Sequence, residues 1–207
     1  MPVVCLIDYG AGNLHSAKRG LERAAPSPDW RVEVSADPET LLAADRLVLP
    51  GVGAFASCAA GLRARDGVEQ AIHEAVSKQA KPFLGICVGM QLLADRGLEH
   101  QITEGLGLIA GTVRALDAKG LRVPHMGWND VRARKEHPVL PADSDAYFVH
   151  SYVFECEDED AVIATCDYGE TFPAAVAKDT VIGAQFHPEK SGAYGLSFLK
   201  NFLEWRP

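Results

Sequence analysis

The feature that most constrains this chain is a strand–turn–helix signal built around a single cysteine, Cys87. The apolar run at residues 83–86 has the length and composition of a buried strand. Gly85 and Gly89 flank the cysteine in the pattern Gly-x-nucleophile-x-Gly, which is the pattern of a nucleophile elbow. The turn of such an elbow is tight, so the side chains beside the nucleophile have to be small. The apolar residues at 90–93 predict that a helix follows.

Cys87 is therefore expected at the N-terminus of a helix. Unpaired backbone N–H groups at such a position stabilise a thiolate and also bind an oxyanion. The alternative is a buried core cysteine, because cysteine is among the residue types most often found inside proteins. The two glycines, together with partner residues further along the chain, favour the nucleophile.

The composition is that of an ordinary globular protein. The chain has 207 residues, of which 47% are hydrophobic and 23% are charged. That length fits one domain, residues 1–207, and is sufficient to bury a full core. The net charge of −8, with no basic tract to offset it, argues against nucleic-acid binding.

The five cysteines are scattered and form no Cys-x-x-Cys pair. This argues against a zinc site and a disulfide framework, and it fits a reducing compartment. Residues 1–8 lack the basic start and the cleavage site of a signal peptide. Since no apolar run is long enough to span a bilayer, we expect a cytoplasmic protein with no membrane contact. We also expect no metal, because His187 and Glu189 lack a clustered third ligand.

The first half of the chain alternates strand and helix signals. Strands are predicted at residues 3–7, 31–34, 46–50 and 83–86, and helices at 14 to about 21, 38–43, 56–64 and 68–80. This alternation predicts an α/β fold with an open, mostly parallel sheet and helices on both faces. Because such sheets bind ligands at the C-terminal ends of their strands, Asp8, Gly51 and Cys87 should gather along one edge.

Two glycine-rich turns follow strands in this half. Residues 10–13 lack both the dinucleotide fingerprint and the Lys-Ser/Thr ending of a phosphate loop, so a plain connection is favoured over nucleotide binding. Gly51, Val52 and Gly53 form the second turn, in which glycines allow backbone N–H groups to point into a cleft. A loop of this kind can supply an oxyanion donor, although most such loops are only turns.

After Gly97 the pattern changes to short strand signals at close spacing. They are predicted at residues 106–113, 123–131, 145–156, 161–166, 174–177 and 181–186, and a helix signal ends the chain. We interpret them as an antiparallel strand region appended to the parallel sheet.

The last of these strands leads into His187, Pro188 and Glu189. Proline stops the strand ladder, so the imidazole is presented at a strand end. Glu189 can turn back to the ring and hold its tautomer, which with Cys87 makes a nucleophile, a base and an orienting carboxylate. The His-x-Glu pattern alone is common in surface turns, and His150 is the nearest rival for the base.

With both halves in view, the chain resembles the class I, triad-type glutamine amidotransferases, and within them the glutaminase subunits of imidazole glycerol phosphate synthase. The resemblance runs nearly end to end and is carried by residues 8–14, 50–55, 84–91, 124–129, 147–152 and 185–191. It implies a flavodoxin-like sheet and a site that needs no cofactor.

The resemblance also implies a role for each matching residue. Cys87 attacks the side-chain amide of L-glutamine and forms a thioester, His187 carries protons, and Glu189 orients the imidazole. The oxyanion is held by backbone N–H groups of Val88, Gly51, Val52 and Gly53. Glutamine is positioned by Gln91, Glu99, Ser151 and Tyr152. A docking face is implied at Asn13, Met126, Trp128 and Lys190, with a core aromatic as the alternative for Trp128.

The implied partner is a (β/α)8-barrel cyclase that forms a heterodimer with the chain and receives the ammonia through a tunnel. It uses the ammonia to make imidazole glycerol phosphate and aminoimidazole carboxamide ribotide in histidine biosynthesis. Three alternatives stay open. The first is a glutaminase subunit of another synthase, which makes pyridoxal phosphate or anthranilate. The second is a non-catalytic interaction protein on the same fold. The third is a cysteine hydrolase of a related elbow fold.

Overall fold

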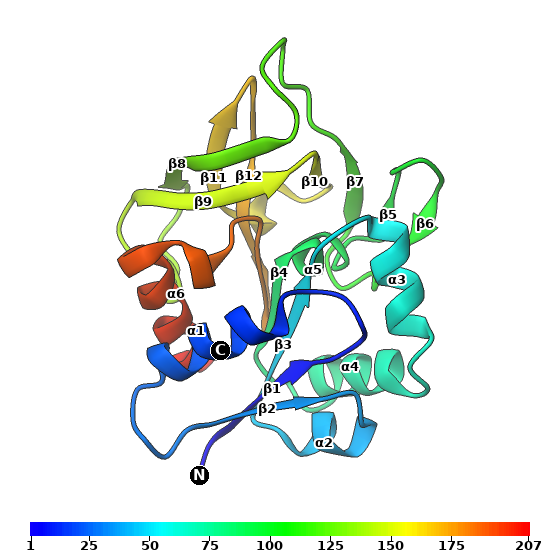
Figure 1. The fold of residues 1–207 in the computed structure, drawn as a ribbon, viewed down its shortest axis with the longest axis vertical. Coiled ribbons are helices and arrows are strands. Elements are labelled where there is room, and N and C mark those ends of the chain that lie inside the picture. Colours follow the sequence, from blue (N-terminus) through cyan, green and yellow to red (C-terminus); the bar gives the residue numbers. More distant parts are fainter.

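The computed structural model describes residues 1–207. Its centre is a nine-stranded sheet, shown in Figure 1. The strands lie in the order β2 (Arg31–Ser35), β1 (Val3–Ile7), β3 (Arg46–Gly51), β4 (Phe83–Cys87), β13 (Val181–Ala184), β12 (Glu170–Lys178), β11 (Val162–Tyr168), β8 (His125–Ala133) and β9 (Ser144–His150). Neighbours from β2 to β13 are parallel, and those from β13 to β9 are antiparallel.

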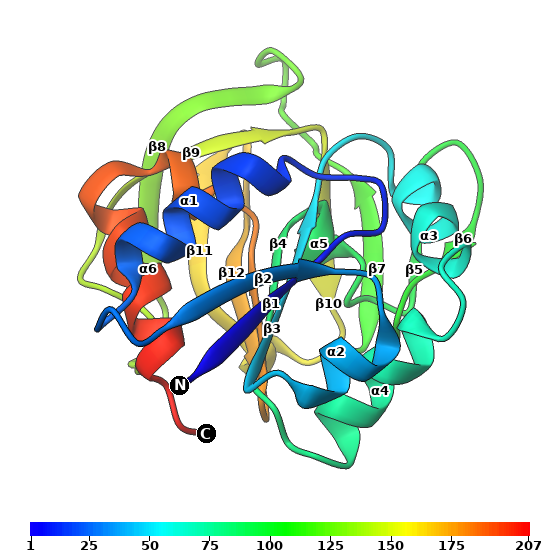
Figure 2. The ribbon, with the colours of Figure 1, turned by 60° about the horizontal axis from the view of Figure 1, so that its bottom comes forward.

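Helices cover both faces of the parallel part, as Figures 1 and 2 show. One face carries α1 (Leu14–Ala24) and α6 (Gly192–Glu204), which pack side by side, and the other carries α2 (Pro38–Ala43), α3 (Phe55–Arg63) and α4 (Val68–Ser77). None of the helices has both the length and the apolar character needed to cross a membrane. The predicted α/β class, with an appended antiparallel region, is therefore confirmed.

A second, four-stranded sheet stands beside the first. Its strands are β10 (Tyr152–Cys156), β7 (Gly111–Ala115), β5 (Arg96–Gly97) and β6 (Thr103–Glu104), in that order. This second sheet was not predicted, because its short strands carry the same signals as the antiparallel strands of the main sheet. Together the two sheets carry the walls of the site described below.

The buried strands and amphipathic helices follow from their side-chain patterns. All five residues of β4 are buried, and β1 and β3 are nearly so, because a parallel sheet covered on both faces excludes water from both sides. The α4 helix buries Val68, Ala71, Ile72 and Ala75, which is the i, i+3, i+4, i+7 stripe of a helix on a core.

Several predicted bounds were wrong. The strand predicted at 145–156 is broken at Ser151 into β9 and β10, which belong to different sheets. Most of the strand predicted at 106–113 is a loop, and β7 begins only at Gly111. The loop forms because backbone N–H groups of residues 106–109 bond to carbonyls of Leu92, Leu93 and Ala94 and to no neighbouring strand.

The helix predicted after Cys87 is short. It is α5 (Val88–Gln91), a helix of four residues. The carbonyls of residues 92–94, which a longer helix would use, accept instead from the 106–109 loop. The predicted end of α4 at residue 80 was also too late, since Ala80 has a φ of 51° and Lys81 donates its N–H back to Ala75.

Strand register aligns the ends of the parallel strands. Gly51 of β3 is paired with Cys87 of β4, and Ala184 of β13 with Ile86. Asp8 immediately follows β1, which is the other neighbour of β3. The prediction that Asp8, Gly51 and Cys87 lie along one edge of the sheet is therefore confirmed.

Candidate active site

Cys87 is the turning point between β4 and α5. It has φ 56° and ψ −112°, a backbone conformation that residues other than glycine rarely adopt. Only 3% of its surface is exposed. The two flanking glycines are required by the close approach of the backbone. A Cβ on Gly89 would lie 1.9 Å from the carbonyl oxygen of Leu49, and one on Gly85 would lie 2.4 Å from that of Gly89. The elbow is thus a steric consequence of the strand-to-helix turn.

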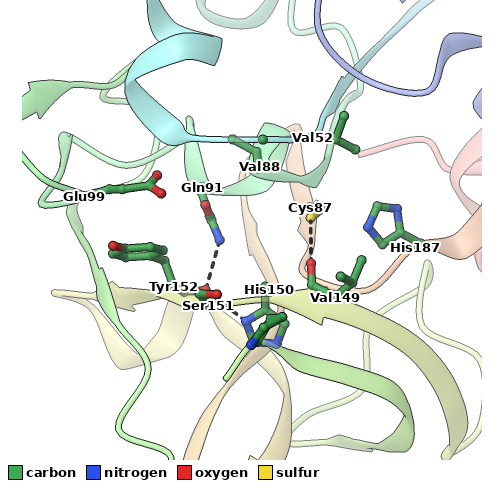
Figure 3. A pocket seen from close by; sticks show the side chains of 12 residues that line it. Val52, Cys87, Val88, Gln91, Glu99, Val149, His150, Ser151, Tyr152 and His187 are labelled. Carbon is green, nitrogen blue, oxygen red and sulfur yellow. Dashed lines mark hydrogen bonds between the residues drawn. The ribbon is translucent and has the colours of Figure 1, made fainter. Parts of the chain in front are cut away.

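The cysteine opens into a cavity of about 240 Å³, shown in Figure 3. Its lining is Val52, Gly53, Cys87, Val88, Gln91, Glu99, Pro124, Val149, His150, Ser151, Tyr152 and His187. The structure therefore brings the predicted nucleophile and base into one cavity, together with all four residues expected to contact glutamine. Of the residues expected to hold an oxyanion, only Gly51 is outside the lining.

The imidazole of His187 is held in place from several sides. Its Nδ1 lies 3.0 Å from Oε1 of Glu189, which the short turn η2 (Pro188–Lys190) brings back to the ring. The backbone is held too, since Ser191 Oγ donates to the His187 carbonyl and the His187 N–H donates to Tyr147. The other ring nitrogen, Nε2, is buried and makes no hydrogen bond within the chain. Figure 3 shows the ring beside Cys87.

The charge of His187 is set by two opposing effects. Burial lowers the pKa of the imidazole, but the sulfur of Cys87 and the carboxylate of Glu189 raise it, and the net pKa is about 9 instead of the ordinary 6.5. The imidazolium form is therefore favoured at neutral pH. A positively charged ring beside the sulfur stabilises a thiolate and has a proton to give to a leaving group.

His150, the rival for the base, has both ring nitrogens occupied. Nδ1 lies 2.9 Å from the carbonyl oxygen of Tyr152, and Nε2 lies 3.0 Å from Nδ1 of His125. Because a carbonyl only accepts, Nδ1 carries the proton and Nε2 accepts from His125. Burial lowers the pKa of His150 to about 3. His150 is therefore a neutral structural group of the cavity wall and is not free to take a proton from Cys87.

Two buried side chains contact backbone carbonyls of the glycine loop at residues 51–53 and of the residue before it. Tyr9 donates its hydroxyl to the carbonyl of Pro50 at 2.6 Å, and the Cys58 thiol lies 3.4 Å from the carbonyl of Val52. Gly53 has a φ of 100°, which glycine adopts without strain. Neither Tyr9 nor Cys58 belongs to a recognisable motif, so neither was predicted as part of the site.

Glu99 lines the cavity and is hydrogen-bonded to the helix that follows this loop. Its carboxylate accepts a hydrogen bond of 2.6 Å from the backbone N–H of Phe55, the first residue of α3. The helix has no side-chain cap of its own residues, so Glu99 supplies a partner for one of its unpaired N–H groups.

The cysteine sulfur has two further neighbours. The carbonyl oxygen of Val149 lies 3.9 Å from Sγ, and Nε2 of Gln185 lies 3.8 Å from it. Gln185 was also missed, although it lies in the segment that includes His187. The pairing of β13 with β4 puts residue 185 beside residue 87, and the sequence carries no local signal for that pairing.

The predicted docking residues lie outside the cavity. Met126 and Trp128 project from β8 with 62% and 58% of their surface exposed, so the core alternative for Trp128 was wrong. Lys190 is exposed and its Nζ lies 5.9 Å from the ring centroid of Tyr147. Asn13 caps α1, where its side chain accepts from the N–H of Ser16.

Comparison with known proteins agrees with this geometry. Residues 5–205 match the family model described as glutamine amidotransferase class-I. The imidazole glycerol phosphate synthase subunit HisH of Bradyrhizobium diazoefficiens is 52% identical, with 99% of each chain covered. The HisH subunit of Zymomonas mobilis is 50% identical, with 99% of this chain and 96% of that protein covered.

Solved structures share the fold. A crystal structure of a glutamine amidotransferase superposes with a TM-score of 0.75 at 21% identity, covering 97% of both chains. A glutamine amidotransferase from Thermotoga maritima gives a TM-score of 0.62 at 19% identity, covering 98% of this chain and 81% of that one. On the family match and the identity to its relatives, the chain belongs to the class-I glutamine amidotransferase family, in the group of HisH subunits of imidazole glycerol phosphate synthase.

Proposed function

We propose that this chain is the glutaminase subunit of an imidazole glycerol phosphate synthase, which hydrolyses L-glutamine to glutamate and ammonia and passes the ammonia to a cyclase. The observation that carries the proposal is the meeting of Cys87, at its strained elbow, with His187 in one cavity, where the buried carboxylate of Glu189 holds the imidazole. The identity to HisH subunits supports the choice of synthase.

Cys87 and His187 divide the chemistry of the two steps. The Cys87 thiolate attacks the side-chain carbonyl carbon of glutamine, and the C–N bond breaks as His187 gives its proton to the departing ammonia. A water then attacks the thioester carbon while His187 takes one of its protons. The C–S bond breaks, releasing glutamate and restoring the thiolate. Glu189 keeps the imidazole oriented and stabilises its charged form throughout.

The oxyanion of each step is held by backbone donors on two elements. One donor is the N–H of Val88 at the start of α5, and the other comes from the Gly51-Val52-Gly53 loop. The glycine at residue 53 lets this loop change its peptide orientation without a large steric cost. We therefore expect weak glutaminase activity from the isolated chain and full activity when the partner orders the loop.

The polar wall of the cavity suits the amino-acid end of glutamine. Glu99 offers a carboxylate to the substrate ammonium, while Ser151 and Tyr152 line the wall between β9 and β10. Gln91 has both N–H groups engaged, with the Tyr152 carbonyl and with Gln185, so its free oxygen is an acceptor.

The cyclase partner, a (β/α)8 barrel in our proposal, is expected on the face that carries Met126, Trp128, Asn13 and Lys190. Two large apolar side chains exposed on one strand are typical anchors of an interface. A basic cleft of about 540 Å³ lies next to Lys190 between α1 and α6. Because His15, Arg19 and Arg23 line this cleft, the matching surface of the partner should be acidic. The five free thiols of the chain suit the cytoplasm, which we propose as the location.

The test is Cys87→Ala, assayed with the cyclase and its ribulosyl-phosphate substrate. We expect glutamine-dependent synthesis to fall by about 10³-fold or more, while synthesis from added ammonia stays at the wild-type rate. Cys156→Ala, at a half-buried thiol outside the cavity, is the matched control. Normal glutamine hydrolysis by the Cys87→Ala protein would refute the mechanism, and capture of a synthase other than the cyclase would refute the partner.

A further inference from the structure

Gln185 is a fully buried amide next to the reactive sulfur, with 0% of its surface exposed. It follows β13, whose Ala184 is paired with Ile86 of β4, so the parallel register puts residue 185 beside Cys87. Its Nε2 lies 3.8 Å from Sγ of Cys87, which is within the range of a hydrogen bond to sulfur. A buried amide at this position needs partners for all of its polar atoms.

The neighbours of Gln185 determine which way its amide points. The carbonyl of Tyr152 can only accept, and it lies 3.0 Å from Nε2 of Gln91, so Gln91 presents its NH₂ group here. The second N–H of that group donates to Oε1 of Gln185 at 3.1 Å. With its oxygen engaged in this way, Gln185 directs its own NH₂ group at the sulfur.

The anchoring carbonyl of Tyr152 is itself held. It accepts a second hydrogen bond, from Nδ1 of His150, whose other nitrogen accepts from His125. His125 in turn lies 3.2 Å from the side-chain nitrogen of Asn129 on β8. The donor and the acceptor of each hydrogen bond in this network are therefore defined, from His125 and His150 through the Tyr152 carbonyl and Gln91 to Gln185 and the sulfur.

We propose that Gln185 is a further catalytic residue, which donates an N–H to the sulfur of Cys87 and thereby stabilises the thiolate that attacks glutamine. A hydrogen bond to an ionised acceptor is stronger than one to a neutral acceptor, so the donor favours the thiolate over the thiol. The same donor assists the second step, when the C–S bond of the thioester breaks and negative charge returns to sulfur. The role in turnover rests on the proposed function, whereas stabilisation of the thiolate does not.

The principal variant is Gln185→Met, which has a similar length and volume but no N–H donor. We measure alkylation of Cys87 by iodoacetamide between pH 5 and pH 10 in the full chain, and quantify the peptide that contains Cys87 by mass spectrometry. We expect the rate at neutral pH to fall about tenfold and the midpoint of the pH profile to rise by about one unit. Gln79→Met, at an exposed position beyond α4, is the matched control and should alkylate as the wild type does.

Steady-state kinetics with the cyclase give a second measurement. We expect kcat to fall about tenfold, because the donor acts on the sulfur. The KM for glutamine should stay within about twofold in Gln185→Glu, which keeps the oxygen that accepts from Gln91, and should rise in Gln185→Met, which does not. The near-isosteric Gln185→Glu, assayed above pH 8, places a carboxylate beside the sulfur and should slow alkylation at least as much.

The proposal is overturned if folded Gln185→Met and Gln185→Glu proteins, with wild-type circular dichroism and wild-type binding to the cyclase, are alkylated at the wild-type rate at every pH. Should Gln185→Met fail to fold, Gln185→Glu alone decides by the same criterion. Alkylation needs neither glutamine nor the cyclase. If the wild-type chain released no ammonia from glutamine in the presence of the cyclase, the proposed function would be refuted, while the alkylation result would be unchanged.

Discussion

Nδ1 of His187 and Oε1 of Glu189 lie 3.0 Å apart, and the two side chains are only 3% and 4% exposed. The pair is closed within one short turn, so no movement of distant elements is needed to bring the carboxylate to the ring. A carboxylate this deeply buried is screened little by solvent, and it stabilises the imidazolium strongly.

Removing the charge of this carboxylate should slow the chemistry and leave substrate binding intact. We expect Glu189→Gln to lower kcat for glutamine by about 10²–10⁴-fold, because the ring loses its orientation and its preference for the charged form. The KM for glutamine should stay within about twofold. The assay is ammonia release with the cyclase present. Glu136→Gln, at an exposed residue with no ion pair, is the control, and equal kcat values for the two variants would contradict the assigned role.

Stability should fall on the alkaline side of neutrality because of His187. The folded protein keeps the ring protonated up to a pKa of about 9, whereas the unfolded chain releases the proton near 6.5. The stabilisation is therefore complete below pH 6.5 and is lost as the pH rises towards 9, on the order of 3 kcal/mol in total. Urea unfolding at several pH values measures it. His187→Gln should give a flatter profile over this window, and a profile as steep as that of the wild type would disprove the link.

On the acid side, His125 and His150 have the opposite effect. Burial lowers their pKa values to about 4 and about 3, so the folded protein keeps both rings neutral while the unfolded chain takes up protons below 6.5. The free energy of unfolding should decrease as the pH falls from 6.5 to 4, by about 1.4 kcal/mol per pH unit for each ring. His150→Gln should reduce this slope by about one ring's share. His15→Gln, at an exposed residue of α1, should leave the dependence of the unfolding free energy on pH unchanged.

Two glycines of the site should respond differently to an added methyl group. Gly89→Ala would push a Cβ to 1.9 Å from a backbone oxygen, so we expect a loss of more than about 4 kcal/mol and little folded protein. Gly53→Ala meets no atom within 4 Å but has a φ of 100°, so it should fold with a loss of about 1–3 kcal/mol.

The Gly53→Ala protein should also lose glutaminase activity by about 10–100-fold, because the oxyanion loop is displaced. Gly120→Ala is the matched control, since Gly120 has a φ of 89° and also has open space at its Cβ. It should lose similar stability and keep full activity. Equal activity in the two alanine variants would show that the loop at residues 51–53 does not supply an oxyanion donor.

The basic cleft beside α1 should contribute to partner binding through charge. We expect Arg19→Glu to weaken the complex with the cyclase by about tenfold at low salt, and by less at about 0.5 M salt, where surface charges are screened. Isothermal titration calorimetry measures both. Lys178→Glu makes the same charge change on β12, at the turn into β13, and should bind as the wild type does. Equal affinity of the two variants would place the interface elsewhere.

What could be predicted from the sequence was local or periodic. The spacing Gly85-x-Cys87-x-Gly89 follows from the steric limits of one turn, and those limits act between neighbours in the chain. The apolar runs that became β1, β3 and β4 signal burial by their own composition. His187 and Glu189 meet within a single turn, so their pairing too was visible in the sequence.

Only the tertiary structure decided the pairings between distant segments. Gln185 meets Cys87 because β13 inserts beside β4, and the choice of strand neighbours depends on the energy of the whole sheet. The split of β9 from β10 at Ser151, and the contact of His125 with His150, likewise depend on which strands become partners. Local composition therefore determined the elbow and the parallel core, while long-range strand pairing, which no local signal records, decided which side chains surround the sulfur.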